Sequence, residues 1–280
     1  MEALKRIIVA AIFAPIMIFC TFNEWYEGLL FFTLLLTAAI LGTLEFIKIF
    51  KKRDIVLNRP LLLTFVIISW GTEYSVNFFA IPLNNVNLWL AIILFFIVCT
   101  AEIFKKDFSQ SLAKIGGSMT IFFYLGIFFP FTYKVKMVAV NGPYIFLLIT
   151  SITWMCDSGA YFIGKYFGKH KLRLPVSPNK TLEGFIGAVV FGVATGFAAR
   201  YIFSANLVLP VFRELQYFIP FILFIVFLTI IGDMIESVFK RSSAVKDSEK
   251  TIAEHGGILD ALYSLIITST STYFVMIFSF

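Results

Sequence analysis

The chain has 280 residues, of which 59% are hydrophobic and only 14% charged, and its mean hydropathy is +0.90. Soluble domains average about 45–50% apolar and about 25% charged residues, so this composition excludes a soluble globular enzyme and a disordered chain. The formal net charge of +6 comes without a long basic run or a soluble module, so it indicates basic loops at a membrane surface and no nucleic-acid partner.

Long apolar runs predict an all-α, polytopic membrane protein. A helix crosses a bilayer with about 20 apolar residues, and this window predicts about nine transmembrane helices. We expect them at residues 6–22, 28–50, 61–81, 87–104, 115–132, 143–164, 183–205, 217–240 and 258–280. The first run follows Lys5 and Arg6 but has no A-x-A cleavage site after it, which favours a retained helix over a signal peptide.

The basic residues predict the orientation of these helices. With the N-terminus inside, the outside segments carry only Lys134, Lys136, Arg200 and Arg213. All the other basic residues then lie on the inside: Lys5, Arg6, Lys48, Lys51, Lys52, Arg53, Arg59, Lys105, Lys106, Lys114, Lys165, Lys169, Lys171, Arg173, Lys180, Lys240, Arg241, Lys246 and Lys250. The positive-inside rule therefore predicts a multi-pass protein of the cytoplasmic (inner) membrane, with a cytoplasmic N-terminus. The polar loops 165–182 and 240–257 are then cytoplasmic as well.

The chain changes in character near residue 150. Residues 1–150 read as hydrophobic helices with plain loops, which we expect to form a transmembrane scaffold. Residues 151–280 hold nearly all the unusual polar residues, and we expect them to form the catalytic region of one integrated membrane domain. The pairs Gly164/Gly168 and Gly192/Gly196 have the GxxxG spacing that favours close helix packing.

Carboxylates inside the late spans indicate a functional site. Each ionisable group costs about 2.5–3.5 kcal/mol to insert, so it needs a reason to be there. Asp233, Glu236 and Lys240 share one helical face, and oxygen ligands on one face suit a hard divalent cation. The alternative is a polar packing stripe in which Glu236 pairs with Lys240. Asp157 and Asp260 add two more carboxylates, and Asp157 could serve as a ligand, a base, a lysine partner or a structural hydrogen-bond acceptor.

Two basic loops offer phosphate ligands. Lys180 follows the turn-forming Pro175 and Pro178 and precedes a helix, whose N-terminus favours anions. A topology signal is an equally good interpretation of Lys180. In the second loop, cationic side chains and paired glycines could hold a lipid phosphate or a nucleotide triphosphate: Lys240, Arg241, Lys246, Gly256 and Gly257.

The combination of acidic, basic and glycine-rich segments at one membrane face predicts phosphoryl or nucleotidyl transfer. Such a site could belong to a lipid kinase, a nucleotidyltransferase, a phosphatase or a phosphotransferase, and these residues do not choose among them. No nucleophile with an adjacent base is found, so a covalent intermediate is not indicated.

Four ordered blocks resemble a known family. The stretch Ser237–Asp260, S-V-F-K-R-S-S-A-V-K-D-S-E-K-T-I-A-E-H-G-G-I-L-D, closely resembles the signature of phosphatidate cytidylyltransferases (CDP-diacylglycerol synthases). The blocks C-D-S-G-A-Y-F-I-G-K-Y-F-G-K from Cys156, S-P-N-K-T-L-E-G from Ser177 and G-D-M-I-E-S from Gly232 also match, whereas the first 150 residues match only in hydropathy. The resemblance implies a nucleotidyltransferase of phospholipid biosynthesis that converts CTP and phosphatidate to CDP-diacylglycerol and pyrophosphate.

The resemblance also implies roles for individual residues. Asp233 and Asp260 would hold Mg²⁺, with a second cation left open, and would act with Asp157 and Lys180 as the catalytic residues. The CTP and lipid headgroup site would be lined by Lys180, Lys240, Arg241, Lys246, Asp247, His255, Gly256 and Gly257. The family resemblance further implies a homodimer embedded in membrane lipid, with dimer contacts in the first 150 residues.

The chain departs from the family signature after the H-G-G block. The family continues as Asp-Arg-hydrophobic-Asp, and this chain has Asp260-Ala261-Leu262-Tyr263. Ala253-Glu254 also replaces the usual Pro-Gly before the histidine. The alternative function is therefore a degenerate, non-catalytic or altered-substrate relative of the family. A transporter is disfavoured because no corresponding interrupted helices are found in two halves.

Overall fold

The computed structural model describes residues 13–79, 85–138, 141–242 and 257–278. Within these residues the chain is helical, and its β-structure amounts to two isolated bridges, so the all-α prediction is confirmed. The chain divides into two compact units. The first unit comprises Met1–Tyr133 and Ser243–Asp260, and the second comprises Lys134–Ser242 and Ala261–Phe280.

Eight helical segments of the described chain are long and apolar enough to cross a membrane. They are Leu29–Lys51, Arg59–Phe79, Val86–Ile103, Ser111–Met137, Gly142–Phe167, Leu182–Ile202, Leu215–Ser242 and Ile258–Phe278. Each coincides with a predicted span, so eight predicted helices are confirmed. The predicted span 6–22 is described only from Phe13, where a shorter apolar helix covers Phe13–Phe22.

The first unit is built from α2 to α5 and the helical turns that follow. Their bounds are α2 Leu29–Lys51, α3 Arg59–Phe79, α4 Val86–Ile103, α5 Ser111–Ile121, the π-helix η1 Phe122–Phe128 and α6 Phe131–Met137, whose last residues belong to the second unit. Helix α2 packs against α3, α3 against η1, and α4 against α5. Fully buried Phe31, Phe46 and Trp70 lie in its core.

The span Ser111–Met137 contains the π-helix η1, and side chains of α3 hydrogen-bond to its backbone. A π-helix shifts the backbone hydrogen bonds and leaves carbonyl groups that need other donors in lipid. Trp70 Nε1 donates to the Leu125 carbonyl oxygen at 2.9 Å, and the Ser69 hydroxyl donates to the Gly126 carbonyl oxygen. Polar side chains of a neighbouring helix therefore make this irregular backbone compatible with a membrane.

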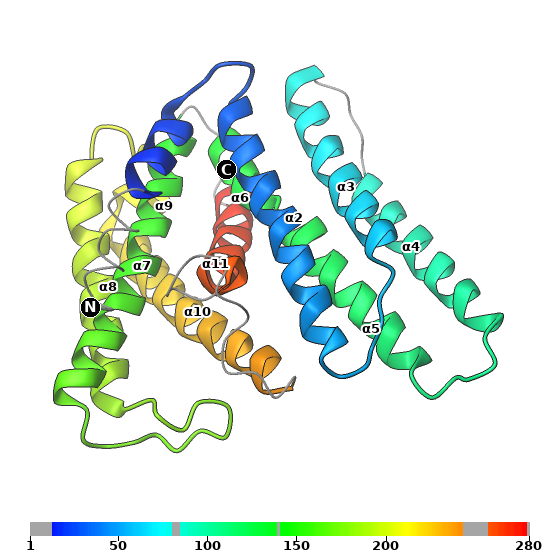
Figure 1. Ribbon diagram of the computed structural model, residues 1–280. Helices are drawn as coiled ribbons and strands as arrows, with labels where there is room; N and C mark the ends of the chain where they lie inside the picture. Colours follow the sequence, from blue (N-terminus) through cyan, green and yellow to red (C-terminus); the bar gives the residue numbers. More distant parts are fainter. Residues whose placement is uncertain (1–12, 80–84, 139–140, 243–256, 279–280) are drawn as a thin grey trace. The chain divides into compact units, whose positions relative to one another are not determined.

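The second unit contains α7 Gly142–Phe167, α8 Leu182–Ile202, the single turn α9 Pro210–Arg213, α10 Leu215–Ser242 and most of α11 Ile258–Phe278. Helices α7 and α8 lie side by side, and one loop joins their ends (Figure 1). A Cβ atom added to Gly159 would lie 2.6 Å from the Gly187 carbonyl oxygen, so these two backbones approach as closely as glycine allows.

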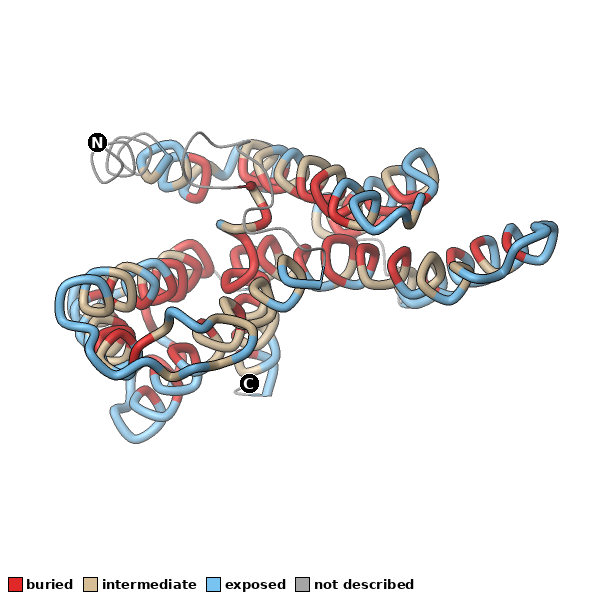
Figure 2. The backbone as a smooth tube through the Cα atoms, turned by 60° about the horizontal axis from the view of Figure 1, so that its bottom comes forward, coloured by how far each residue is buried: buried red, intermediate tan, exposed pale blue. Residues whose placement is uncertain are grey.

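Large apolar side chains face outward as well as inward. Buried and exposed residues alternate along the helices at helical spacing (Figure 2). On α10, Ile222 and Ile225 are buried, whereas Leu223, Phe224 and Phe227 are exposed. Exposed aromatic and aliphatic side chains on long helices are typical of surfaces that face lipid. The fold is that of a multi-pass membrane protein.

Candidate functional site

The loop between α7 and α8 folds back on itself. Isolated bridges pair Lys171 with Thr181 and Leu174 with Ser177. The Leu172 amide donates to the Lys180 carbonyl oxygen at 2.8 Å, and the Leu182 amide donates to the His170 carbonyl oxygen at 2.8 Å. These hydrogen bonds hold Lys180 in a folded hairpin-like loop.

The first turn of α8 anchors the base of this loop. Thr181 is the N-cap, and its hydroxyl oxygen accepts the Gly184 amide at 3.1 Å. Glu183 reaches back to His170, accepting its backbone amide at 3.2 Å and lying 2.6 Å from its ring Nδ1 atom. Lys180, one residue before the cap, is thereby held next to a helix N-terminus.

Lys180 forms an ion pair with Asp233 of α10. The Lys180 Nζ atom lies 2.5 Å from Asp233 Oδ2, and the two side chains are 24% and 41% exposed. Asp157 of α7 interacts electrostatically with both residues. Within the second unit the structure therefore brings together two carboxylates and one ammonium group from three different segments of the chain.

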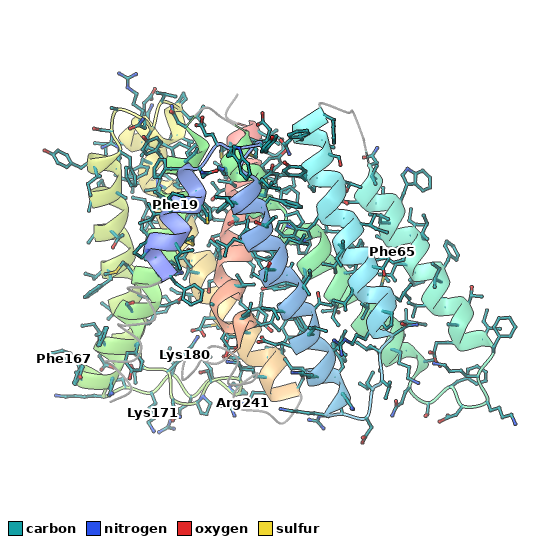
Figure 3. All side chains as sticks on the ribbon, turned by 45° about the horizontal axis from the view of Figure 1, so that its top comes forward. Phe19, Phe65, Phe167, Lys171, Lys180 and Arg241 are labelled. Carbon is teal, nitrogen blue, oxygen red and sulfur yellow. The ribbon has the colours of Figure 1, made fainter. Side chains whose placement is uncertain are left out.

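Two further contacts involve the C-terminal end of α10, which is predicted to face the cytoplasm. Glu236 forms an ion pair with Lys240, and both side chains are largely buried. Arg241 Nε donates to the Val176 carbonyl oxygen at 3.3 Å, which ties the end of α10 to the loop that precedes α8. Lys171, Lys180 and Arg241 lie at the same end of this unit (Figure 3). Basic side chains thus gather at the end of the unit that holds the Lys180–Asp233 pair.

Asp260 lies in the first turn of α11 and belongs to the first unit. Its Oδ2 atom accepts the Gly257 amide at 3.0 Å. Glu45 of α2 contacts the same turn, since its carboxylate oxygens accept the Ile258 and Leu259 amides at 2.9 and 3.0 Å. Glu45 was not among the site residues predicted from the sequence. The available signal was a carboxylate inside an apolar span.

The predicted site residues fall into three groups. Asp157, Lys180, Asp233, Lys240 and Arg241 belong to the second unit, and Gly257 and Asp260 to the first. Lys246, Asp247, His255 and Gly256 lie outside the described residues. The convergence of Asp233 and Asp260 on one cation stays a prediction.

Carboxylate oxygens, such as those of Asp233 and Asp260, are the type of ligand that magnesium prefers. No cluster of three or more His, Cys, Asp or Glu side chains that could hold a metal occurs within the described ranges. Magnesium needs fewer protein ligands, since it is usually bound by one or two carboxylates together with substrate phosphates and water. Asp233 in the second unit and Asp260 in the first each carry oxygen donors of this kind, and Lys180, which pairs with Asp233, carries a cation of the kind that suits phosphate.

Within the described residues, eight helices long and apolar enough to cross a membrane, with an ion pair that joins the loop before α8 to α10, define a multi-pass membrane protein. The pattern that describes the cytidylyltransferase family matches residues 4–279, and the chain belongs to that family.

Three similar proteins are all named phosphatidate cytidylyltransferase. The chain is 31% identical to the one from Thermotoga maritima over 280 residues, covering 98% of this chain and 97% of the relative. It is 30% identical to the one from Bacillus subtilis, covering 97% of each chain. The match to the one from Haemophilus influenzae is 41% identical over 125 residues, covering 45% of this chain and 43% of the relative.

Proposed function

We propose that this protein transfers the cytidylyl group of CTP to phosphatidate. A phosphate oxygen of phosphatidate attacks the α-phosphorus of CTP, and a new phosphorus–oxygen bond forms. The bond from the α-phosphorus to the oxygen bridging the β-phosphate breaks, so CDP-diacylglycerol and pyrophosphate are the products. The observation that carries the proposal is the Lys180–Asp233 ion pair, with Asp157 in electrostatic range, in a member of the cytidylyltransferase family that matches the family pattern over residues 4–279.

The side chains of the site would have two roles, to neutralise charge and to position the substrates. Lys180 would contact a phosphate group of CTP or phosphatidate, and the basic residues at the end of α10, Lys240 and Arg241, would line the same site. Asp233 and Asp260 would hold Mg²⁺, which, when bound, would neutralise charge on the triphosphate and the leaving pyrophosphate. The Asp157 carboxylate would interact electrostatically with Lys180 and Asp233 and so influence the net charge around the bound phosphates. Lys246, Asp247, His255, Gly256 and Gly257 would complete the substrate contacts.

The setting of the reaction is part of the proposal. The basic loops favour an orientation in which the N-terminus and the site face the cytoplasm, where CTP is available. The enzyme would act as a homodimer in the inner membrane, with residues 1–150 as scaffold and residues 151–280 as the catalytic region. No nucleic acid takes part.

The test is a radiolabelled-CTP assay on the purified protein in lipid–detergent micelles. With the label in the cytidylyl part of CTP, we expect labelled CDP-diacylglycerol, together with unlabelled pyrophosphate, only when phosphatidate and Mg²⁺ are both present. An isoprenoid-ether lipid and other nucleotides serve as competing substrates. Turnover of one of these in place of phosphatidate or CTP would overturn the proposed substrate pair, and absence of turnover with the whole panel would overturn the proposed reaction.

A non-catalytic or altered-substrate relative is the second candidate, because Ala261 and Tyr263 replace an arginine and an aspartate of the family signature. The Tyr263 side chain is 1% exposed and stacks on Phe239 of α10, with ring centroids 6.0 Å apart. This tyrosine therefore contributes to helix packing, and the aspartate it replaces would fit poorly in its present surroundings.

We expect the double substitution Ala261→Arg with Tyr263→Asp to give no gain in turnover and a lower yield of folded protein. Ala261→Arg alone should leave the yield unchanged, because residue 261 is exposed. Yield and turnover are measured by size-exclusion chromatography and the CTP assay. A large gain in turnover by the double variant would favour the degenerate relative.

A further inference from the structure

A buried carboxylate meets the start of the helix that bears Asp260. Glu45 of α2 is 2% exposed, and its two oxygens accept the Ile258 and Leu259 amides at 2.9 and 3.0 Å. Both amides lie in the first turn of α11, where no carbonyl of the same helix is available to them. A carboxylate at this end of a helix also interacts favourably with the helix dipole. Glu45 therefore binds the first turn of α11 through two charge-assisted hydrogen bonds.

The remaining donors of this turn are satisfied within it. The Gly257 amide donates to Asp260 Oδ2 at 3.0 Å, and the Asp260 amide donates to the Gly257 carbonyl oxygen at 3.2 Å. This reciprocal arrangement resembles a capping box, which fixes the side chain at the third helical position. The orientation of the Asp260 carboxylate thus depends on the same turn that Glu45 holds.

The Leu259 side chain of this turn packs against α2 next to Gly42. Leu259 is fully buried, and a Cβ atom added to Gly42 would lie 3.1 Å from Leu259 Cδ2 and 3.4 Å from Leu125 Cδ1. Gly42 precedes Glu45 by three residues, so the two positions lie on one face of α2. The glycine admits the Leu259 side chain, and the glutamate accepts the Leu259 amide. Two neighbouring positions of α2 therefore fix one residue of α11.

We propose that Glu45 is a positioning residue that orients Asp260 by holding the first turn of α11. The inference rests on the proposed function, in which Asp260 is a ligand of Mg²⁺. It has a second consequence, since the Ile258 and Leu259 amides are occupied by Glu45. A phosphate group of the substrate is then bound by side chains rather than by these two amides.

The test is Glu45→Gln in the purified protein. A glutamine side chain presents an NH₂ group to one of the two amide donors, so one hydrogen bond is lost and the turn loosens. Loss of an outer partner of a metal ligand costs about 10–100-fold in metal affinity or activity. We expect a fall of that size in turnover at limiting Mg²⁺, a matching rise in the Mg²⁺ concentration for half-maximal rate, and a weaker affinity for Mn²⁺ measured by electron paramagnetic resonance without CTP. Glu45→Asp, which keeps the charge on a shorter side chain, should give an intermediate result.

The matched control is Glu73→Gln. Glu73 of α3 is 6% exposed, and its carboxylate accepts the Asn87 side-chain amide within the same unit. The chemical change and the burial are alike, so this variant should lose thermal stability but keep the wild-type Mg²⁺ dependence and Mn²⁺ affinity. If Glu45→Gln does not fold, Gly42→Ala provides the second variant, because its added methyl group crowds Leu259 without changing any charge. It should weaken Mn²⁺ binding in the same direction.

Each outcome decides the proposal. A Glu45→Gln protein with a lower melting temperature but wild-type Mn²⁺ affinity and Mg²⁺ dependence would overturn the proposal. Glu45 would then only stabilise the fold. A wild-type protein that binds no Mn²⁺ would overturn the proposal as well. A wild-type protein that binds Mn²⁺ without turning over CTP would contradict the proposed function alone, and the Mn²⁺ affinities of the variants would still decide the role of Glu45.

Discussion

Replacing Asp233 by asparagine is expected to lower CTP- and phosphatidate-dependent release of pyrophosphate by about 10²–10³-fold, the usual cost of removing one group that stabilises charge in a transition state. Asp233 lies 2.5 Å from Lys180 and is proposed to hold Mg²⁺. The amide that replaces it cannot neutralise either cation, although it has nearly the same size. Initial rates at saturating CTP and phosphatidate, per mole of folded protein, measure the effect.

Asp107→Asn is the matched control. Asp107 lies in the loop between α4 and α5, and its carboxylate accepts the Ser109 amide and hydroxyl, both at 2.9 Å. The asparagine oxygen can still accept the Ser109 amide, and its NH₂ group can donate to the Ser109 hydroxyl, so this variant should keep wild-type turnover. An Asp233→Asn protein with activity within twofold of the wild type would contradict the proposed site.

The coupling between Asp233 and Lys180 gives a sharper measure of the same prediction. Lys180→Met alone should also cost activity, because it removes the cation that faces both carboxylates. If the two residues act as one unit, Lys180→Met with Asp233→Asn should cost little more than the worse single variant, since effects within a unit are not additive. Fully additive losses would mean that the two side chains act independently of their ion pair.

The helices could be predicted from the sequence because bilayer thickness sets their length. The predicted span 28–50 and the observed α2, Leu29–Lys51, differ by one residue at each end. The span that follows α4 differs more, since residues 115–132 were expected and Ser111–Met137 is observed. A hydropathy window stops at polar residues such as Lys114 and Lys134, whereas backbone hydrogen bonding continues through them.

The candidate site could be predicted only in part. Asp157 and Asp233 stand out because a carboxylate inside an apolar span needs a partner. The partners of Glu45 and Arg241 are backbone groups, at residues 258 and 259 and at Val176 respectively. Every residue carries such groups, so no sequence pattern reveals which of them a distant side chain will meet. The three-dimensional structure was needed to find those two contacts.

Widening the closest approach of α7 and α8 is expected to impair both folding and turnover. A Cβ atom added to Gly187 would lie 2.7 Å from the Gly159 carbonyl oxygen and 2.6 Å from Ile163 Cβ. A backbone carbonyl cannot move aside as a flexible side chain can, so the helices must separate. Overpacking of this kind costs about 1–3 kcal/mol, and we expect Gly187→Ala to lower the thermal midpoint by about 2–4 °C for each kcal/mol. Gly187→Leu should largely abolish folded protein.

Turnover should fall further than stability explains, because these two helices position the site. Gly159 follows Asp157 by two residues on α7, and Lys180 immediately precedes the N-cap of α8. Separating the helices therefore moves Asp157 relative to Lys180. Gly116→Ala on α5 is the matched control, since nothing lies within 4 Å of its added methyl group and alanine is the better helix former. Thermal melting in detergent and turnover per folded molecule separate the two effects, and a Gly187→Ala protein that matches Gly116→Ala in both would show that the close approach of α7 and α8 is dispensable.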